Sequence, residues 1–284
     1  MPSFPIVDTH VHFWNSDEVP IPWTAGVPAL NRSFGPDDLT LHADPVEIEA
    51  LVFVEADVAP GAHIREAEWV GSLAVQDPRI QAIVAHAPLE KGAGVAADLE
   101  ALAALPLVRG VRRLIQHEPD PAFCLQAGFV EGVRLLPRFG LHFEICIFHP
   151  QFESAVSLVR QCPEVRFVLD HIAKPGIKDG LMEPWATHMT AMAECDNVIC
   201  KLSGVATEAD HENWSDAHLR PYMDHALEAF GSDRVMFGGD WPVATLAIDY
   251  PRWVGLVEDA MAGASEAERR QVFRDNGVAV YRLG

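Results

Sequence analysis

The sequence predicts a single (β/α)8 barrel. Three observations support this fold class: eight short apolar runs, helix-like segments between most of them, and a length of 284 residues, which is normal for a one-domain α/β barrel. Most of the runs are continuous rather than alternating, which is typical of strands that are buried on both faces. We therefore expect one domain over residues 1–284, with a parallel sheet closed by an outer layer of helices.

The eight expected strands are the β-branched, apolar runs at 6–13, 50–56, 80–87, 108–115, 141–148, 166–171, 197–204 and 235–241. Helices are expected between them, and 63–76 and 216–230 have apolar residues at helical spacing. Gly231 suits the C-terminal cap of the second of these helices. Near the C-terminus, Ser265 and Glu268 have the spacing of a capping box, so another helix should begin there.

The longest irregular segment covers residues 14–45 and is rich in Pro, Trp and Gly. It follows the first expected strand. In a barrel, the loops that follow the strands lie at the catalytic mouth. We therefore expect this segment to form a loop over the active site, as a lid or a pocket wall.

Composition excludes several classes of partner. Asp and Glu number 41 against 21 Lys and Arg, for a formal charge of −20. This balance disfavours nucleic acid and anionic membranes, and we exclude both. No apolar run approaches the roughly 20 residues that span a bilayer, and the N-terminus has no signal-peptide pattern. The five cysteines are scattered without a C-x-x-C pair, as expected for free thiols in the cytoplasm.

The chemistry is expected at the carboxyl ends of the strands, where barrel active sites form. His10 and His12 alternate along the first strand, so both project into the mouth. Two such imidazoles can share a metal ion or polarise one carbonyl oxygen. His171 and Asp240 end later strands. Asp240 could bind a metal, act as general base and return the proton to a leaving group; the alternative is a turn carboxylate that caps the next helix.

Other charged residues lie in or after strands that should be buried, where a charge needs a reason. They are Glu55, His86, Arg112, Arg113, Glu144, His149, Asp170 and Lys201. Three roles are considered for Glu144: a further ligand, a substrate contact, or the partner of a nearby arginine. His149 precedes Pro150, which favours a capping or loop role. Asp170 is expected to orient a neighbour.

Five motifs carry a resemblance that runs almost from end to end: VDTHVHFW at 7–14, RGVRRLIQ at 109–116, DHIAKP at 170–175, CKLSG at 200–204 and GDWP at 239–242. With these motifs the chain resembles the amidohydrolase superfamily, and within it the amidohydrolase-2 branch of sugar-lactone hydrolases. That branch includes L-fuconolactonase, L-rhamnonolactonase and other aldonolactonases, together with muconolactone and pyrone-dicarboxylate lactonases.

The resemblance implies roles for individual residues. His10, His12, His171 and Asp240 would form the catalytic constellation and hold at most one divalent metal, with Zn2+ favoured; some members of the branch work without a metal. The fourth strand carries arginines and no lysine, so a binuclear site bridged by a carbamylated lysine is not expected. The substrate would be bound by Arg112, Arg113, Lys201, Trp14, Trp23, Glu144 and Trp241.

The function expected from these residues is hydrolysis of the intramolecular ester of a sugar lactone to the aldonic acid, in sugar catabolism. The histidines would polarise the lactone carbonyl, and Asp240 would take a proton from water and return it to the ring oxygen. The double arginine and the Trp-rich first loop favour aldonolactones over dicarboxylate lactones. The alternatives are a metal-dependent decarboxylase, an amide or imide hydrolase, and a non-catalytic small-molecule binder. The sequence does not decide whether the chain forms a homo-oligomer.

Overall fold

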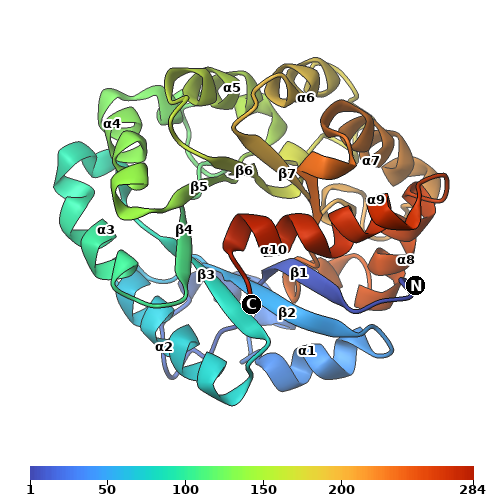
Figure 1. Ribbon diagram of the computed structural model, residues 1–284, viewed down its shortest axis with the longest axis horizontal. Coiled ribbons are helices and arrows are strands. Elements are labelled where there is room, and N and C mark those ends of the chain that lie inside the picture. Colours follow the sequence, from blue (N-terminus) through green and yellow to red (C-terminus); the bar gives the residue numbers. More distant parts are fainter.

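A computed structural model describes residues 1–284, and the barrel expected from the sequence is confirmed (Figure 1). Eight parallel strands follow one another around the sheet in chain order. They are β1 Ile6–Val11, β2 Ile48–Val54, β3 Ile80–His86, β4 Val108–Arg112, β5 His142–Ile145, β6 Phe167–Leu169, β7 Val198–Leu202 and β8 Val235–Phe237. All eight end earlier than the apolar runs suggest, because the residues at the mouth leave the ladder.

Ten α-helices accompany the strands; most of them form the outer ring seen in Figure 1, and α10 crosses one end of the barrel. They are α1 Pro36–Ala43, α2 His63–Gln76, α3 Ala96–Ala103, α4 Ala127–Leu135, α5 Phe152–Gln161, α6 Trp185–Ala193, α7 Asp216–Phe230, α8 Tyr250–Ala260, α9 Glu266–Arg270 and α10 Asn276–Tyr281. The helices expected at 63–76 and 216–230 are confirmed. So is the capping box that opens α9, in which Ser265 and Glu268 exchange hydrogen bonds. None of the helices is long and apolar enough to cross a membrane.

The expectation of an irregular segment over 14–45 is partly wrong. The segment contains two short 3-10 turns, Pro22–Gly26 and Pro28–Leu30, and the helix α1. The Asp38 carboxylate accepts the Gly35 N–H at 3.0 Å at the start of α1. The helix α1 has only eight residues, and only Leu39 and Ala43 of them are buried. Two apolar positions are too few to establish a helical period, so the sequence pattern does not predict this helix.

The barrel closes at its catalytic end. No regular ladder joins β8 to β1; instead, Val11 forms a bridge with Trp241, just beyond β8. The His12 N–H donates to the Trp241 carbonyl at 2.7 Å, and the Asp240 N–H donates to the His10 carbonyl at 2.8 Å. The backbone of the first strand is thus hydrogen bonded to the segment that carries Asp240.

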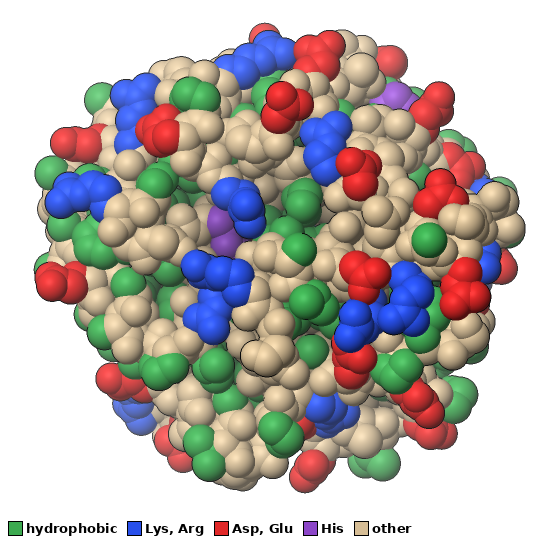
Figure 2. All heavy atoms as spheres, in the orientation of Figure 1, with side chains coloured by type: hydrophobic (Ala, Val, Ile, Leu, Met, Phe, Trp, Pro, Cys, Tyr) green, Lys and Arg blue, Asp and Glu red, His purple; other side chains and the backbone are tan.

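The opposite end is covered by α10, which crosses the barrel on the near side in Figure 1. The Arg109 side chain, at the start of β4, donates to the Tyr281 carbonyl at 3.1 Å, and the Gly284 N–H donates to Gln81 of β3 at 3.1 Å. Figure 2 shows this same end of the molecule, with acidic and basic side chains interspersed over it. The open mouth, with the site, therefore faces the other way.

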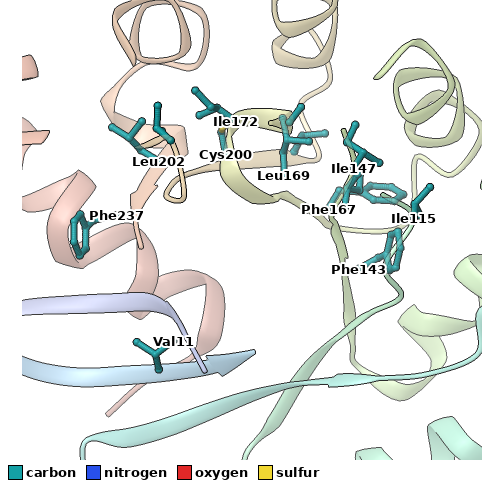
Figure 3. Close-up of a cluster of buried hydrophobic side chains, with 14 of the residues drawn as sticks. Val11, Ile115, Phe143, Ile147, Phe167, Leu169, Ile172, Cys200, Leu202 and Phe237 are labelled. Carbon is teal, nitrogen blue, oxygen red and sulfur yellow. The ribbon is translucent and has the colours of Figure 1, made fainter. Parts of the chain in front are cut away.

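Apolar residues form two cores. The larger one fills the space between the strands and the helices with 74 buried residues; Figure 3 shows part of it, with Phe143, Phe167 and Leu169 of β5 and β6. The smaller one, inside the barrel, has eight members from β2, β3, β6, β8 and α10. Tyr281 of α10 belongs to this inner core and extends from it toward the charged residues above.

Candidate active site

Three imidazoles and one carboxylate converge at the carboxyl ends of the strands. His10 belongs to β1, His12 directly follows it, His171 follows β6, and Asp240 follows β8. The Asp240 Oδ1 atom lies 3.5 Å from Nε2 of His12, 3.8 Å from Nε2 of His10 and 4.0 Å from Nε2 of His171. All four side chains are buried. The structure thus brings the four residues expected for the constellation around one point.

Unusual backbone geometry aims two of these side chains inward. His171 has φ 54° and Asp240 has φ 53°, in the left-handed region that few side-chain-bearing residues adopt. The turn that begins at His171 stays left-handed through Lys174. Gly204 makes room for both residues, because a Cβ there would lie 2.6 Å from Nδ1 of His171 and 2.9 Å from Oδ2 of Asp240. Strain of this kind persists only where surrounding structure enforces it, and it concentrates at functional sites.

The hydrogen bonds behind the rings decide which nitrogen lone pairs face the site. Nδ1 of His12 lies 2.8 Å from the Val54 carbonyl, which only accepts, so Nδ1 carries the proton and Nε2 presents its lone pair to Asp240. Nδ1 of His171 lies 2.9 Å from the Ser203 hydroxyl, which can accept or donate. A nitrogen lone pair and a carboxylate oxygen repel each other. This arrangement is therefore favourable only with a cation or a proton between Nε2 of His12 and Asp240.

Electrostatics set the charges of the constellation. Burial alone would raise the pKa of the Asp240 carboxyl, but the imidazoles of His171, His12 and His10 hold that pKa well below its ordinary value. Burial lowers the pKa of His171 to about 4, and burial together with the Lys201 charge lowers the pKa of His10. At neutral pH the site therefore holds a carboxylate with at least two neutral imidazoles, the protonation state that metal binding requires.

A second layer of charges lies beneath the histidines, and Arg112 forms one half of it. Its Nε donates to Oε1 of Glu55 at 2.7 Å, and its Nη2 donates to the Glu55 carbonyl at 2.6 Å. Nη1 lies 3.2 Å from Oδ2 of Asp170 and 3.3 Å from Nε2 of His10. Arg112 therefore ties the end of β2 to β6 and supports the ring of His10 from below.

Lys201 forms the other half. Its Nζ lies 2.5 Å from Oε2 of Glu144, 3.2 Å from Oδ1 of Asp170 and 3.2 Å from Nδ1 of His10. Glu144 in turn accepts a hydrogen bond from the Tyr281 hydroxyl at 2.5 Å. Burial would raise the pKa of Asp170, but Lys201 and Arg112 lower it to about 2. A continuous polar chain therefore runs from His10 down to α10.

The charges of the two layers do not cancel. Four buried carboxylates, Glu55, Glu144, Asp170 and Asp240, surround the histidines, whereas Arg112 and Lys201 are the two buried cations among them. One divalent cation would balance the difference. The ligand atoms of His10, His12 and Asp240 lie within 4.8 Å of one another, and imidazole with carboxylate is a donor set that suits Zn2+. The residues therefore fit one divalent metal, which His10, His12 and Asp240 would hold, with Nε2 of His171 beside them at 4.0 Å from Asp240.

Above this constellation lies a pocket of about 200 Å³. Six residues expected for the site line it: His12, His171, Asp240, Arg112, Trp14 and Trp23. Its other polar walls are Asp57, Gln116, His117 and Lys174. Pockets for drug-sized ligands usually hold 300–1,000 Å³, so this one suits a single small ring.

Four residues expected to contact substrate do not line the pocket. Arg113 follows Arg112 and points the opposite way, as neighbours on a strand do; it pairs with Glu118 at 2.6 Å and Glu90 at 3.2 Å. Lys201 and Glu144 are fully buried in the lower layer, and the partner of Glu144 is this lysine, not an arginine.

Trp241 is the fourth such residue. It is fully buried and donates its indole N–H to His42 at 2.9 Å. It packs between Phe13 and Phe34 and supports the loop segment from behind. His149 opens the 3-10 turn His149–Gln151 outside the pocket, which agrees with the loop role expected for it.

Two residues near the site, Asp8 and Asp57, were not predicted from the sequence. Asp8 accepts hydrogen bonds from the His10 N–H at 2.9 Å and the Gly239 N–H at 2.8 Å, and from the Tyr250 hydroxyl at 2.8 Å. It thereby fixes β1 to the loop that carries Asp240. Its place in the VDTHVH motif is the signal that could have revealed it. Asp57 has no such signal, since it lies outside every quoted motif.

Comparison with known proteins places the chain in a family. The amidohydrolase family model matches residues 7–283. The chain belongs to this family. This amidohydrolase is 32% identical to L-fucono-1,5-lactonase of Burkholderia multivorans (strain ATCC 17616 / 249), over 98% of this chain and 96% of the relative. It is 24% identical to L-rhamnono-gamma-lactonase of Scheffersomyces stipitis (strain ATCC 58785 / CBS 6054 / NBRC 10063 / NRRL Y-11545), over the full length of both.

A solved structure is also similar to the amidohydrolase described here. It is a crystal structure of an amidohydrolase from Burkholderia multivorans with bound zinc, and it superposes with a TM-score of 0.87 at 30% sequence identity. The alignment covers 99% of this chain and 100% of that one. The barrel and its mouth therefore have a close counterpart of known structure.

Proposed function

We propose that this amidohydrolase hydrolyses the intramolecular ester of a sugar lactone and releases the aldonic acid. The observation that carries the proposal is the convergence of His10, His12, His171 and Asp240 at the floor of a pocket sized for one small ring. Its similarity to L-fucono-1,5-lactonase and L-rhamnono-gamma-lactonase supports the same chemistry.

The pocket walls give the substrate its orientation. Trp14 and Trp23 form an aromatic side against which a sugar ring can pack. Their indole N–H groups donate to the carbonyls of Arg32 and Ala56, at 2.7 and 2.8 Å, which holds both rings in place. With the ring against this wall, the ester carbonyl points down toward the histidines and the hydroxyl groups face Gln116, His117 and Lys174.

Asp240 acts as the proton carrier. Its low pKa keeps it ionised, so it accepts a proton from the attacking water as the new C–O bond forms at the carbonyl carbon. The tetrahedral intermediate then collapses, the bond to the ring oxygen breaks, and Asp240 returns the proton to that oxygen. The products are a free hydroxyl and a carboxylic acid, which ionises and releases one proton to solvent.

Other residues stabilise the negative charge on the carbonyl oxygen. His171 can donate from Nε2 when Ser203 donates to its Nδ1, and Arg112 supplies a fixed positive charge at the floor of the same pocket. One preorganised donor at such an oxyanion contributes about 3–4 kcal/mol. With a divalent ion bound, Zn2+ being expected, His10, His12, His171 and Asp240 would hold it, and Nε2 of His171 would give its lone pair to the ion instead of a proton to the substrate. The ion would polarise the carbonyl and lower the pKa of the attacking water.

The test is acid release, followed with a pH indicator, from a panel of aldonolactones. Wild-type enzyme is compared with Asp240→Asn and with Asp224→Asn, an exposed aspartate on α7 that serves as the control. Each is assayed after chelation and again with added Zn2+. Acid release that is lost in Asp240→Asn alone supports the proposal, and the chelated samples show whether a metal is needed. No acid release from any lactone, with or without Zn2+, overturns it and favours decarboxylation, which CO2 release would then detect.

A further inference from the structure

Asp57 occupies a constrained position at the pocket edge. It lies three residues beyond the end of β2 and has φ 53°, a left-handed conformation that aspartate and asparagine tolerate better than most residues. Its N–H donates to Oε2 of Glu55 at 2.9 Å, and Glu55 is itself fixed by Arg112. The lower charged layer thus determines where the Asp57 side chain lies.

The Asp57 carboxylate lines the pocket and makes no hydrogen bond or ion pair within the protein. The other charged residues in the pocket are engaged: Arg112 with Glu55 and Asp170, Asp240 with the histidines, and Lys174 with Glu208 at 3.9 Å. Asp57 is exposed as a whole residue, but partial burial of its carboxyl and the negative charge of Glu55 raise its pKa, and the positive charges of Arg112 and Arg113 offset only part of this effect. Its two oxygens are free to accept hydrogen bonds from a ligand.

The chemistry of a carboxylate restricts what that ligand can be. An ionised carboxylate only accepts hydrogen bonds, so its partners must be donors, and the hydroxyl groups of a sugar ring are such donors. A second carboxylate on the substrate would be repelled by the Asp57 carboxylate at this position, because like charges at close range repel each other. Gln116 and His117 add neutral polar groups to the pocket. The wall therefore matches a neutral polyhydroxylated ring.

We infer that Asp57 determines substrate specificity by accepting hydrogen bonds from ring hydroxyl groups of a neutral sugar lactone and by repelling lactones that carry an additional carboxylate. This inference rests on the proposed lactone hydrolysis. It assigns the choice between aldonolactones and dicarboxylate lactones to one residue, which takes no part in bond breaking.

The experiment compares wild type with Asp57→Asn on three probes: glucono-1,5-lactone, which bears hydroxyls; δ-valerolactone, which has none; and 2-pyrone-4,6-dicarboxylate. Asparagine keeps the shape and tolerates the left-handed φ, and a thermal melt checks the fold. Asp179→Asn, in the loop after β6 and outside the pocket, is the control for loss of a mouth charge. In Asp57→Asn, we expect kcat/KM on glucono-1,5-lactone to fall about 10- to 100-fold, the range for a hydrogen bond to a charged group. The value for δ-valerolactone should stay within about twofold, and cleavage of the dicarboxylate should rise.

The outcomes distinguish the role assigned to Asp57 from the proposed lactone hydrolysis. Equal losses on glucono-1,5-lactone and δ-valerolactone, or no loss on either, overturn the assignment of Asp57 while leaving lactone hydrolysis intact. The same selective loss in Asp179→Asn also overturns it, because the effect would then come from mouth charge in general. If wild type cleaves none of the three lactones, the proposed function fails and the inference fails with it.

Discussion

The two layers at the mouth of this barrel contain similar residues but are organised in opposite ways. In the upper layer, Asp240 faces His10, His12 and His171, and no arginine or lysine forms an ion pair with it. In the lower layer, each carboxylate has a cation within 3.2 Å, supplied by Arg112 or Lys201. Both layers are buried, so burial does not distinguish them. Chemistry is concentrated where the charges are left uncompensated, and the paired charges below hold that arrangement in place.

His10 belongs to both layers. Its Nε2 faces Asp240 at 3.8 Å, while its Nδ1 lies 3.2 Å from Lys201 and 3.4 Å from Asp170. A change in the lower layer should therefore reach the upper one through this ring. Substitutions in either layer test this link.

The largest effect on activity is expected from Asp240→Asn. The amide cannot accept the proton from water, so kcat should fall about 10²- to 10⁴-fold, the contribution of a positioned general base. The melting temperature should fall, because the lowered pKa of Asp240 means that the fold stabilises its anion at neutral pH. A rate within tenfold of wild type would assign the proton transfer to another group.

Lys201→Met should cause the largest loss of stability. It leaves Glu144 and Asp170 buried beside each other without their shared cation, which costs about 3–5 kcal/mol in the free energy of unfolding. Denaturant titration measures this loss in the free energy of unfolding, and Lys178→Met, at an exposed lysine, is the control. Adding Glu144→Gln to Lys201→Met should recover part of the loss, since the double variant buries one charge fewer. A double variant that is less stable than Lys201→Met would contradict the pairing.

Tyr281→Phe tests the end of the polar chain at α10. It removes one hydrogen bond to a charged acceptor, for an expected loss of about 1.5–3 kcal/mol. Glu144 keeps Lys201 and the His142 ring at 3.2 Å, so kcat should change less than stability does. Tyr222→Phe is the matched control, because Tyr222 is a largely buried tyrosine whose hydroxyl makes no hydrogen bond within the protein. Equal losses in the two variants would remove any special role for Tyr281.

The smallest effect concerns Glu66, a buried carboxyl on α2 with no cation. Its Oε1 accepts the Ala56 N–H at 2.8 Å, while Oε2 has no partner. Burial and the charge of Glu55 raise the pKa of Glu66 well above its ordinary value of 4.5. Between that value and the raised pKa, the folded chain holds a proton that the unfolded chain has released, so stability falls as pH rises.

Glu66→Gln removes this dependence. The variant should match wild type at pH 4 and exceed it at pH 8 by about 1.4 kcal/mol for each unit of the shift. Thermal melts at the two pH values measure the difference. A gain that is the same at pH 4 and pH 8 would mean that packing, and not ionisation, is responsible.

The sequence predicted the barrel because strands buried on both faces leave continuous apolar runs, and it predicted the four converging residues because strand ends meet at one mouth. Side chains alternate between the two faces of a strand, which explains why Arg112 reaches the pocket and Arg113 does not. Applied to the sequence, this two-residue period predicts that only one of the two arginines faces the site. The Glu144–Lys201 pair joins β5 to β7 across the barrel interior. A single sequence carries no signal for such a contact, nor for a loop residue such as Asp57.

The hydrogen bonds that close the barrel have a consequence for synthesis of the chain on the ribosome. Asp240 and the Trp241 carbonyl that receives the His12 N–H are made more than two hundred residues after His10 and His12. While that length of chain is being synthesised, the two histidines have no Asp240 carboxylate beside them. The four-residue constellation can form only after the segment beyond β8 has been made and has bonded to the first strand.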